Sequence, residues 1–237
     1  MKTKIFYVIA SLFLMLTMIQ LSTNCQELKE PPVISALPGN IPSDAIILFD
    51  GTDLSKWSYA DGRPAGWIVK NGEMMVKGGS IKTNEEFGDM QLHLEFCTPA
   101  PAKGKSQDRG NSGVYFLGNY EVQVLDSYEN STYWDGSCGA IYKQHVPLVN
   151  ASRPPGIWQV YDIVFHPPQV DVNGQVIKKA TLTVFHNGVL IQDNVEVKGP
   201  TGGAAGNVEK TKGSILLQDH NHPVKYRNIW VRQLPPR

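Results

Sequence analysis

The stretch Thr181–Gln192 reads TLTVFHNGVLIQ, and it predicts two antiparallel strands joined by a tight turn. Apolar runs with a period of two lie on both sides of the pair Asn187-Gly188, which is typical of half-buried strands. Asn-Gly supplies the two positive φ angles of a type I′ turn, whose twist matches that of antiparallel strands. This stretch therefore predicts a β-hairpin.

The same turn signal recurs along the chain. Asn71-Gly72 lies within WIVKNGEMMV and Asn173-Gly174 lies within DVNGQVI, each between two apolar runs. The reversed pair Gly118-Asn119 within SGVYFLGNYEVQVL predicts a further turn. The sequence therefore favours a chain built from successive hairpins.

Further strands are predicted at Trp158–Phe165, Ser214–Gln218 and Lys225–Val231, and no segment of useful length shows an apolar period of 3.6 residues. This pattern predicts an all-β fold, an antiparallel two-sheet jelly-roll sandwich of the concanavalin A-like kind. An immunoglobulin-like sandwich is the alternative, although it usually has fewer strands and fewer long loops.

The N-terminal segment has the layout of a secretory signal peptide. Lys2 and Lys4 precede Ile5–Ile19, an apolar run of 15 residues, and a membrane span needs about 20. We expect residues 1–25 to be removed on export to the periplasm or the medium. A lipid anchor at Cys25 is the alternative. No second apolar run of this kind follows, so we expect no transmembrane span in the mature chain.

After this segment, residues 26–43 are proline-rich and predict an extended leader, and residues 44–237 suit a single domain. Without Lys2 and Lys4, 20 basic and 22 acidic side chains remain, with no basic block. This balance argues against nucleic acid as a partner. Cys97 and Cys138 form either a disulfide, which export would allow, or two buried thiols.

The strand at Tyr120–Asp126, YEVQVLD, has an apolar face and a polar face. Residues i and i+2 of a strand point the same way, so Glu121 and Gln123 share the polar face, and Asp126 follows just beyond. A polar face can simply be the side of a sheet that water wets. The choice of a carboxylate and an amide, in place of Lys, Ser or Thr, favours a binding groove.

Other polar side chains would join this groove if its sheet is concave. His93 and Glu95 share a face of a second strand. Near the C-terminus lie Gln218, His220 and Arg227, and before the Glu121 strand lie Arg109 and Asn111. Such acids, bases and amides, with exposed aromatic side chains at Tyr128, Tyr133 and Trp134, suit the hydroxyls and apolar faces of a sugar.

No nucleophile elbow, zinc-protease motif, P-loop or dinucleotide fingerprint is present, so we expect no nucleotide cofactor. His93 and Glu95, with Glu121 and His220, are candidate ligands for one divalent metal ion, because imidazole and carboxylate together suit such ions. The spacing alone leaves open whether a metal binds.

A series of motifs carries a resemblance to a known family. They are LFDGTDLSKW (Leu48–Trp57), LHLEF (Leu92–Phe96), RGNSGVYF (Arg109–Phe116), YEVQVLDSY (Tyr120–Tyr128), VNASRPPGIWQVYDIVF (Val149–Phe165), HNGVLIQDN (His186–Asn194), GPTGG (Gly199–Gly203) and LQDHNHPVKYRNIWVR (Leu217–Arg232). From about Asp44 onward the chain resembles the 3-keto-disaccharide hydrolase family. The resemblance implies a concanavalin-like jelly roll related to family-16 glycoside hydrolases. It also implies an exported bacterial enzyme that acts on sugars oxidised at C3.

Family-16 glycosidases carry Glu-x-Asp-x-Glu, or a bulged form with one more residue. This chain has the bulged spacing at Glu121, Gln123 and Asp126, with Gln for the middle Asp and Asp for the last Glu. A retaining glycosidase needs two carboxyl groups about 5–5.5 Å apart, and Gln cannot act as an acid. The departure puts the ordinary double displacement in doubt.

A 3-keto-glycoside or 3-keto-disaccharide offers another route, because its C3 carbonyl acidifies the C2 hydrogen: loss of the C2 proton, elimination of the C1 group, and addition of water or none. His220 or Glu121 would be the base, with Asp126 as the third catalytic candidate. A metal on His93 and Glu95, or Arg227 alone, would stabilise the enolate. Arg109, Asn111, Gln123 and Gln218 would hold sugar hydroxyls. Two alternatives stay open, a lectin-like module that binds oligosaccharides without cleaving them and an ordinary retaining glycosidase.

Overall fold

The computed structural model describes residues 30–35, 40–204 and 208–237. The predicted signal peptide, with Cys25 and its alternative lipid anchor, lies outside the described residues, as does part of the leader. Ala36–Arg237 make one compact unit. No helix among the described residues is long and apolar enough to span a membrane.

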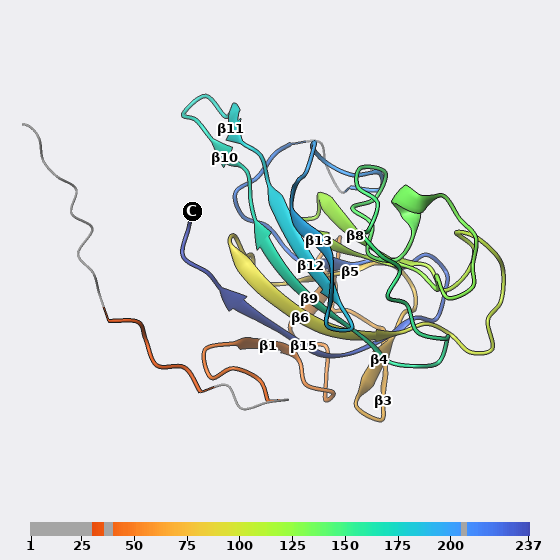
Figure 1. Cartoon of the computed structure of the whole chain (residues 1–237). Coiled ribbons are helices and arrows are strands. Elements are labelled where there is room, and N and C mark those ends of the chain that lie inside the picture. The colour runs from red at the N-terminus through yellow and green to blue at the C-terminus, as the bar shows by residue number, and fades with distance from the viewer. Residues whose placement is uncertain (1–29, 36–39, 205–207) are drawn as a thin grey trace, which may run out of the picture. The chain divides into compact units, whose positions relative to one another are not determined.

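Antiparallel strands make up almost all the regular structure, as the hairpin signals predict (Figure 1). The larger sheet of the described residues has eight strands in the order β13-β12-β9-β6-β15-β4-β3, with β1 paired to β15. Its strands are β1 (Ile46–Phe49), β3 (Ile68–Lys70), β4 (Glu73–Met75), β6 (Met90–Cys97), β9 (Gln159–His166), β12 (Thr181–His186), β13 (Val189–Glu196) and β15 (Lys225–Gln233).

The smaller sheet has five strands in the order β2-β5-β14-β7-β8. Its strands are β2 (Trp57–Tyr59), β5 (Ile81–Thr83), β7 (Ser112–Phe116), β8 (Tyr120–Val124) and β14 (Leu216–Leu217). The strands β10 (Gln169–Val170) and β11 (Val176–Lys178) form a separate hairpin, and η1 (Trp134–Gly136) is a single 3₁₀ turn in a long loop.

The two sheets pack face to face on a shared core. Leu92 and Leu94 of β6 contribute to it from the larger sheet, and Val122 of β8 contributes from the smaller one. The rings of Phe116 and Phe165, one from each sheet, have centroids 4.9 Å apart. Because side chains alternate along a strand, burying these residues turns their neighbours outward. The all-β, two-sheet sandwich predicted from the sequence is confirmed.

Two of the predicted type I′ turns form as expected. Asn71-Gly72 and Asn187-Gly188 have positive φ at both residues, and the strands pair directly across them. At Asn173-Gly174 the prediction is wrong, because only Gly174 has positive φ. There the carboxylate of Asp171 accepts the backbone N–H groups of Asn173 and Gln175 and holds a longer loop.

The turn predicted at Gly118-Asn119 lies one residue earlier. Leu117 and Gly118 take the positive φ angles, at 54° and 70°. Asn119 donates its backbone N–H to Phe116, and its buried side chain donates to the carbonyl of Val208. This turn sets the pairing of β7 with β8, which places Tyr115 opposite Glu121 and Gly113 opposite Gln123.

Candidate active site

A cavity of about 200 Å³ opens on the outward face of the five-stranded sheet. Strands β7 and β8 and the segment after β14 supply most of its walls, and two loops close it. Its lining residues are Asn111, Tyr115, Glu121, Gln123, Tyr142, Gly202, Gly203, Gln218 and His220. The structure thus brings together five residues predicted from the sequence: Glu121, His220, Asn111, Gln123 and Gln218.

Glu121 is the one carboxylic acid among the described residues that line this cavity, and it is 2% exposed. The hydroxyl of Tyr115 donates a hydrogen bond of 2.8 Å to its Oε2. Burial raises the pKa of Glu121 to about 8, while the Tyr115 hydrogen bond lowers it. Glu121 therefore has the pKa of a group able to exchange protons near neutral pH.

Tyr115 stays a neutral donor beside this carboxyl group. Burial, and then the neighbouring charge of Glu121, raise the pKa of its hydroxyl far above the ordinary value. The same hydroxyl oxygen accepts the side-chain N–H of Gln218 at 3.1 Å. Gln218, Tyr115 and Glu121 thus form one hydrogen-bonded line across three neighbouring strands.

Three amide oxygens around the cavity are buried without a hydrogen-bond partner among the described residues: Oδ1 of Asn111, Oε1 of Gln123 and Oε1 of Gln218. Their amide nitrogens are all bonded, to Gln107 for the first two and to Tyr115 for the third. Orphaned buried acceptors are rare and call for an explanation. A ligand rich in hydroxyl donors would satisfy them, and a sugar is such a ligand.

His220 lies at the exposed edge of the cavity. Its ring stacks on that of His222, with centroids 6.1 Å apart and planes 10° apart. His222 lines a second cavity, of about 360 Å³. The histidine pair therefore joins the two cavities.

Two other segments also pass from the first cavity to the second. Asn111 lines the first cavity while Arg109 lines the second, and Gln123 lines the first while Asp126 lines the second. The second cavity is largely apolar at Pro99–Pro101 and Pro223. The two cavities are thus neighbours, and together they have room for a substrate of two parts.

Asp126 and Arg109 form an ion pair, in which the Asp126 side chain is buried and the Arg109 side chain is partly exposed. The carboxylate of Asp126 accepts from Arg109 Nε at 2.7 Å and from the backbone N–H of Tyr128 at 3.2 Å. Arg109 also donates to the Tyr128 carbonyl. The expectation that Asp126 faces the same cavity as Glu121 is corrected here, because β8 ends at Val124 and the next residue, Leu125, is also in the core. The strand alternation therefore does not extend to Asp126, which lines the second cavity.

His93, Glu95 and Arg227 do not join the Glu121 cavity. They belong to β6 and β15 of the eight-stranded sheet, and they point away from the core on its outward face. The expectation that they converge with Glu121 and His220 is corrected here. The sequence shows which face of each strand is polar. It does not show that β6 and β15 belong to a different sheet from β8.

The donor set of His93 and Glu95 does not fit a divalent ion. His93 Nδ1 lies 2.7 Å from Asp162, and Glu95 accepts from Arg227 Nε at 2.7 Å and from Asn228. Among the described residues, no three His, Cys, Asp or Glu side chains are grouped to hold a metal. These side chains act as an ion-pair network on the sheet surface.

The aromatic side chains expected at the sugar site lie outside the cavity lining, although the Tyr133 hydroxyl is 2.7 Å from that of the lining residue Tyr142. Tyr128, Tyr133 and Trp134 do not line the cavity, and Trp134 is 72% exposed. The tyrosines that do line the cavity, Tyr115 and Tyr142, were not among the residues predicted for the site. Tyr115 lies between the core residues Val114 and Phe116 on β7. The alternation that turns Glu121 outward therefore predicts that Tyr115 points outward as well.

Cys97 and Cys138 are both free and buried, which settles the choice left open by the sequence in favour of two thiols. Cys138 Sγ lies 3.0 Å from the Tyr161 hydroxyl.

The fold and site define an all-β sandwich with a polar cavity on the outward face of its five-stranded sheet. The chain belongs to the family of the 3-keto-alpha-glucoside-1,2-lyase-like domain, whose sequence model matches residues 44–232. The resemblance seen in the sequence motifs is thereby confirmed. No curated protein matches the chain.

Solved structures of Parabacteroides distasonis proteins, described as candidate glycosyl hydrolases, are similar to this chain. One is 44% identical, covers 88% of this chain and 95% of its own, and superposes with a TM-score of 0.81. A second is 19% identical over 81% of this chain and 94% of its own, with a TM-score of 0.62. A third is 22% identical over 80% and 99%, with a TM-score of 0.57. The last two show the fold alone.

Proposed function

We propose that this chain cleaves the glycosidic bond of 3-keto-glycosides by removing the C2 proton and eliminating the group at C1. The observation that carries the proposal is Glu121, a single buried carboxyl group with a pKa near 8 among three unpartnered amide oxygens. Membership of the 3-keto-glucoside lyase-like family supports the same substrate class.

Glu121 acts as the base in this proposal. The C3 carbonyl acidifies the C2–H bond, and the ionised carboxylate takes that proton. Once Glu121 is protonated it no longer requires the hydrogen bond from Tyr115. The Tyr115 hydroxyl can then donate to the enolate oxygen that forms at C3, a role that Arg227 cannot fill from the other sheet.

His220 protonates the leaving oxygen. It lies at the edge of the first cavity, on the side of the second one, so the bond that breaks falls between the two cavities. The C1–O bond breaks as the C2–C1 double bond forms, and the leaving group departs as an alcohol. Water added across the enone gives the free 3-keto sugar, which amounts to hydrolysis.

Asn111, Gln123 and Gln218 hold the ring. Their unpartnered oxygens accept hydrogen bonds from ring hydroxyls, and their bonded nitrogens fix the direction of each amide. A cavity of about 200 Å³ suits one sugar ring. The second ring or aglycone extends into the neighbouring cavity, past Arg109 and His222.

The retaining-glycosidase alternative is less well supported. It needs two carboxyl groups about 5–5.5 Å apart. The described lining of the first cavity offers only Glu121, and Asp126 is committed to Arg109. The lectin-like alternative uses the same amides but requires no base.

The test is to incubate the protein with a 3-keto glucoside and with its unoxidised parent, and to identify the products. We expect aglycone release from the keto sugar alone. Glu121→Gln and His220→Ala should each abolish release. His93→Ala is the matched control, because its side chain lies on the other sheet, and it should retain activity. Binding of the parent sugar without turnover of either substrate would favour the lectin.

We also propose export, on the strength of Lys2, Lys4 and the apolar run Ile5–Ile19. Expression in a bacterial host, with the mass of the exported chain measured, should show cleavage near Cys25. A mass matching uncleaved protein in the cytoplasm would contradict export, and a mass increased by lipid would support the anchor.

A further inference from the structure

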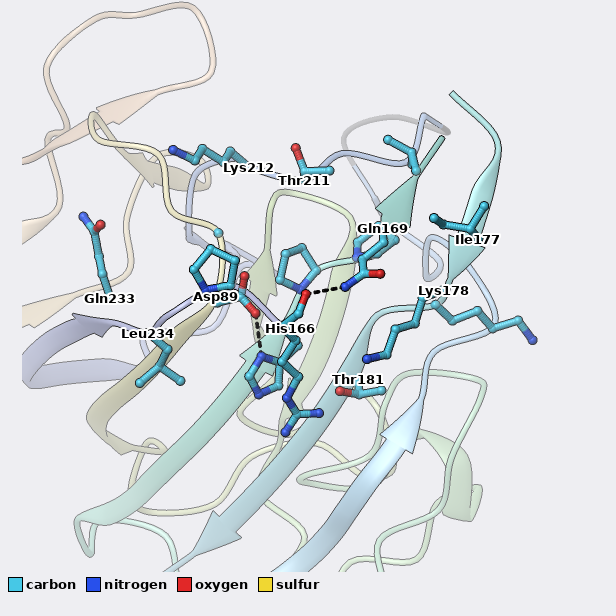
Figure 2. Close-up of a pocket in the computed structure, with 17 residues that line it drawn as sticks. Asp89, His166, Gln169, Ile177, Lys178, Thr181, Thr211, Lys212, Gln233 and Leu234 are labelled. Atoms are coloured by element: carbon cyan, nitrogen blue, oxygen red, sulfur yellow. Dashed lines mark hydrogen bonds and ion pairs between the residues drawn. The ribbon is translucent and has the colours of Figure 1, made fainter. Parts of the chain in front are cut away.

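A cavity of about 650 Å³ lies beside the ends of β9 and β15 and the start of β12, and its described lining shares no residue with that of the Glu121 cavity (Figure 2). His166 ends β9 and Thr181 begins β12, and both point outward because their neighbours Phe165 and Leu182 face the core. The β10–β11 hairpin and the loop at Thr211 and Lys212 form its sides.

Asp89 and His166 form a hydrogen-bonded pair on the floor of the cavity, and one ring nitrogen of His166 remains able to bond to a ligand. Asp89 Oδ1 lies 2.6 Å from His166 Nδ1, and each side chain is only 12% exposed (Figure 2). This contact fixes the ring and directs Nε2 away from Asp89. His166 therefore presents a second, oriented nitrogen.

Thr181 adds a second polar group to the floor. It lies directly opposite His166 in the strand register, so the two side chains are neighbours on the same face. Thr181 is 6% exposed, and its hydroxyl has no hydrogen-bond partner among the described residues. A buried hydroxyl without a partner costs stability unless something else occupies the site.

The rim is cationic in a chain that is neutral overall. Lys178 and Lys179 from the hairpin and Lys212 from the facing loop line the cavity, and all three are exposed. The one acidic side chain of the described lining, Asp89, is already engaged by His166. Arg237 adds a further cation to the lining, and its main-chain oxygen accepts a hydrogen bond from Gln169. The lining thus keeps an excess of positively charged side chains, which attracts an anion.

The described lining carries apolar surface but no aromatic ring other than His166. Pro167, Pro168, Ile177 and Leu234 supply it. Such walls suit the CH faces of a saccharide, while a nucleotide base would find no ring on which to stack. The volume lies within the range of about 300–1,000 Å³ that is typical of ligand sites.

We propose that this cavity is a second carbohydrate-binding site, specific for a saccharide with a carboxylate or sulfate group. Lys178, Lys179 and Lys212 bind the acidic group, and the floor at His166 and Thr181 hydrogen-bonds ring hydroxyls. The site holds an acidic glycan to the protein while the Glu121 cavity works independently. It does not rest on the proposed reaction.

The test is calorimetric titration with a trigalacturonate, a sulfated trisaccharide and a neutral trisaccharide, at low and high salt. We expect the wild type to bind at least one acidic sugar about tenfold more tightly than the neutral one, and more weakly at high salt. The two acidic arms distinguish carboxylate from sulfate. The double variant K178A/K179A should lose about tenfold in affinity.

Two further variants test whether a loss of affinity is specific to this cavity. K56A/K82A removes two lysines that belong to other parts of the chain and should bind as the wild type does. Thr181→Val keeps the shape, removes the unpartnered hydroxyl, and should weaken binding without lowering the free energy of unfolding. Release of aglycone from a small neutral 3-keto glucoside should be unchanged in all of them.

Three results would overturn the proposal: equal affinity for acidic and neutral sugars, equal losses in K178A/K179A and K56A/K82A, or binding of inorganic sulfate as tight as that of the sulfated sugar. The last would indicate a simple anion site.

Discussion

Gly113 and Glu121 lie so close on neighbouring strands that a Cβ atom on Gly113 would be 2.5 Å from Oε1 of Glu121. The same Cβ atom would be 3.0 Å from the ring of Tyr115. The missing side chain of Gly113 therefore creates the space in which the carboxyl group sits, and no larger residue leaves it there.

Gly113→Ala should displace the Glu121 carboxyl group. We expect kcat/KM for a 3-keto glucoside to fall about a hundredfold, which is the typical cost of misplacing a reacting group by about 1 Å. The free energy of unfolding should fall by about 1–3 kcal/mol from overpacking. Gly66→Ala is the control and should retain activity, because its Cβ would make a comparably tight contact, 3.1 Å from the Tyr59 hydroxyl, outside the lining of the Glu121 cavity. Full activity in Gly113→Ala would contradict the assignment of Glu121.

Tyr115→Phe should move the pH dependence of the reaction. The Tyr115 hydrogen bond lowers the pKa of Glu121, so removing it leaves burial to raise that pKa above about 8. If Glu121 is the base, kcat/KM rises with pH, and the midpoint of the rise should shift to higher pH in the variant. Tyr142→Phe should not shift it, because the Tyr142 hydroxyl bonds to Tyr133. An unchanged or lower midpoint in Tyr115→Phe would count against this role.

Glu121→Gln should make the free energy of unfolding less dependent on pH. The folded pKa of Glu121, about 8, lies above its ordinary value of 4.5. Below pH 4.5 both folded and unfolded chains hold the proton, and stability is full. Between pH 4.5 and 8 only the unfolded chain gives the proton up, so stability is lost as pH rises.

The variant cannot lose a proton at this position. Its free energy of unfolding, measured with denaturant, should therefore improve relative to the wild type as pH rises from 4.5 to 8. A difference that stays constant over this range would show that Glu121 is not held protonated by the fold.

Asp126→Asn should lower the free energy of unfolding, because Asp126 acts chiefly as the partner of Arg109. Removing one partner of a buried ion pair costs about 3–5 kcal/mol, and this is an upper limit here because the Asp126 side chain is 1% exposed but that of Arg109 is 16% exposed. Asp162→Asn, whose partner is His93 and whose side chain is 40% exposed, should cost only about 0–1 kcal/mol. Denaturant unfolding compares the two. An Asp126→Asn variant with unchanged stability but no activity would restore the catalytic role expected from the sequence.

The alternation of side chains along strands was enough to predict the fold and part of the site. It placed Glu121 and Gln123 on the polar face of β8, and the turn chemistry at Asn187-Gly188 placed β12 beside β13. His220 and Gln218 could be predicted because they end a strand of the same sheet.

Alternation alone cannot tell which of the two sheets a strand joins. His93 and Glu95 show the same polar pattern as Glu121, but β6 pairs with β9 and β15 in the other sheet. Asp126 follows Glu121 by five residues, but the strand alternation stops at Val124 and Leu125, which are both in the core, and Asp126 lines the second cavity. These outcomes depend on pairing between distant segments, which local pattern does not encode.

The most direct test uses a 3-keto glucoside with deuterium at C2. If Glu121 removes the C2 proton, the wild type should release the aglycone and leave a sugar product without deuterium, while Glu121→Gln should do neither. Mass spectrometry of the sugar product measures this. An aglycone released by the wild type with deuterium still at C2 would contradict the elimination.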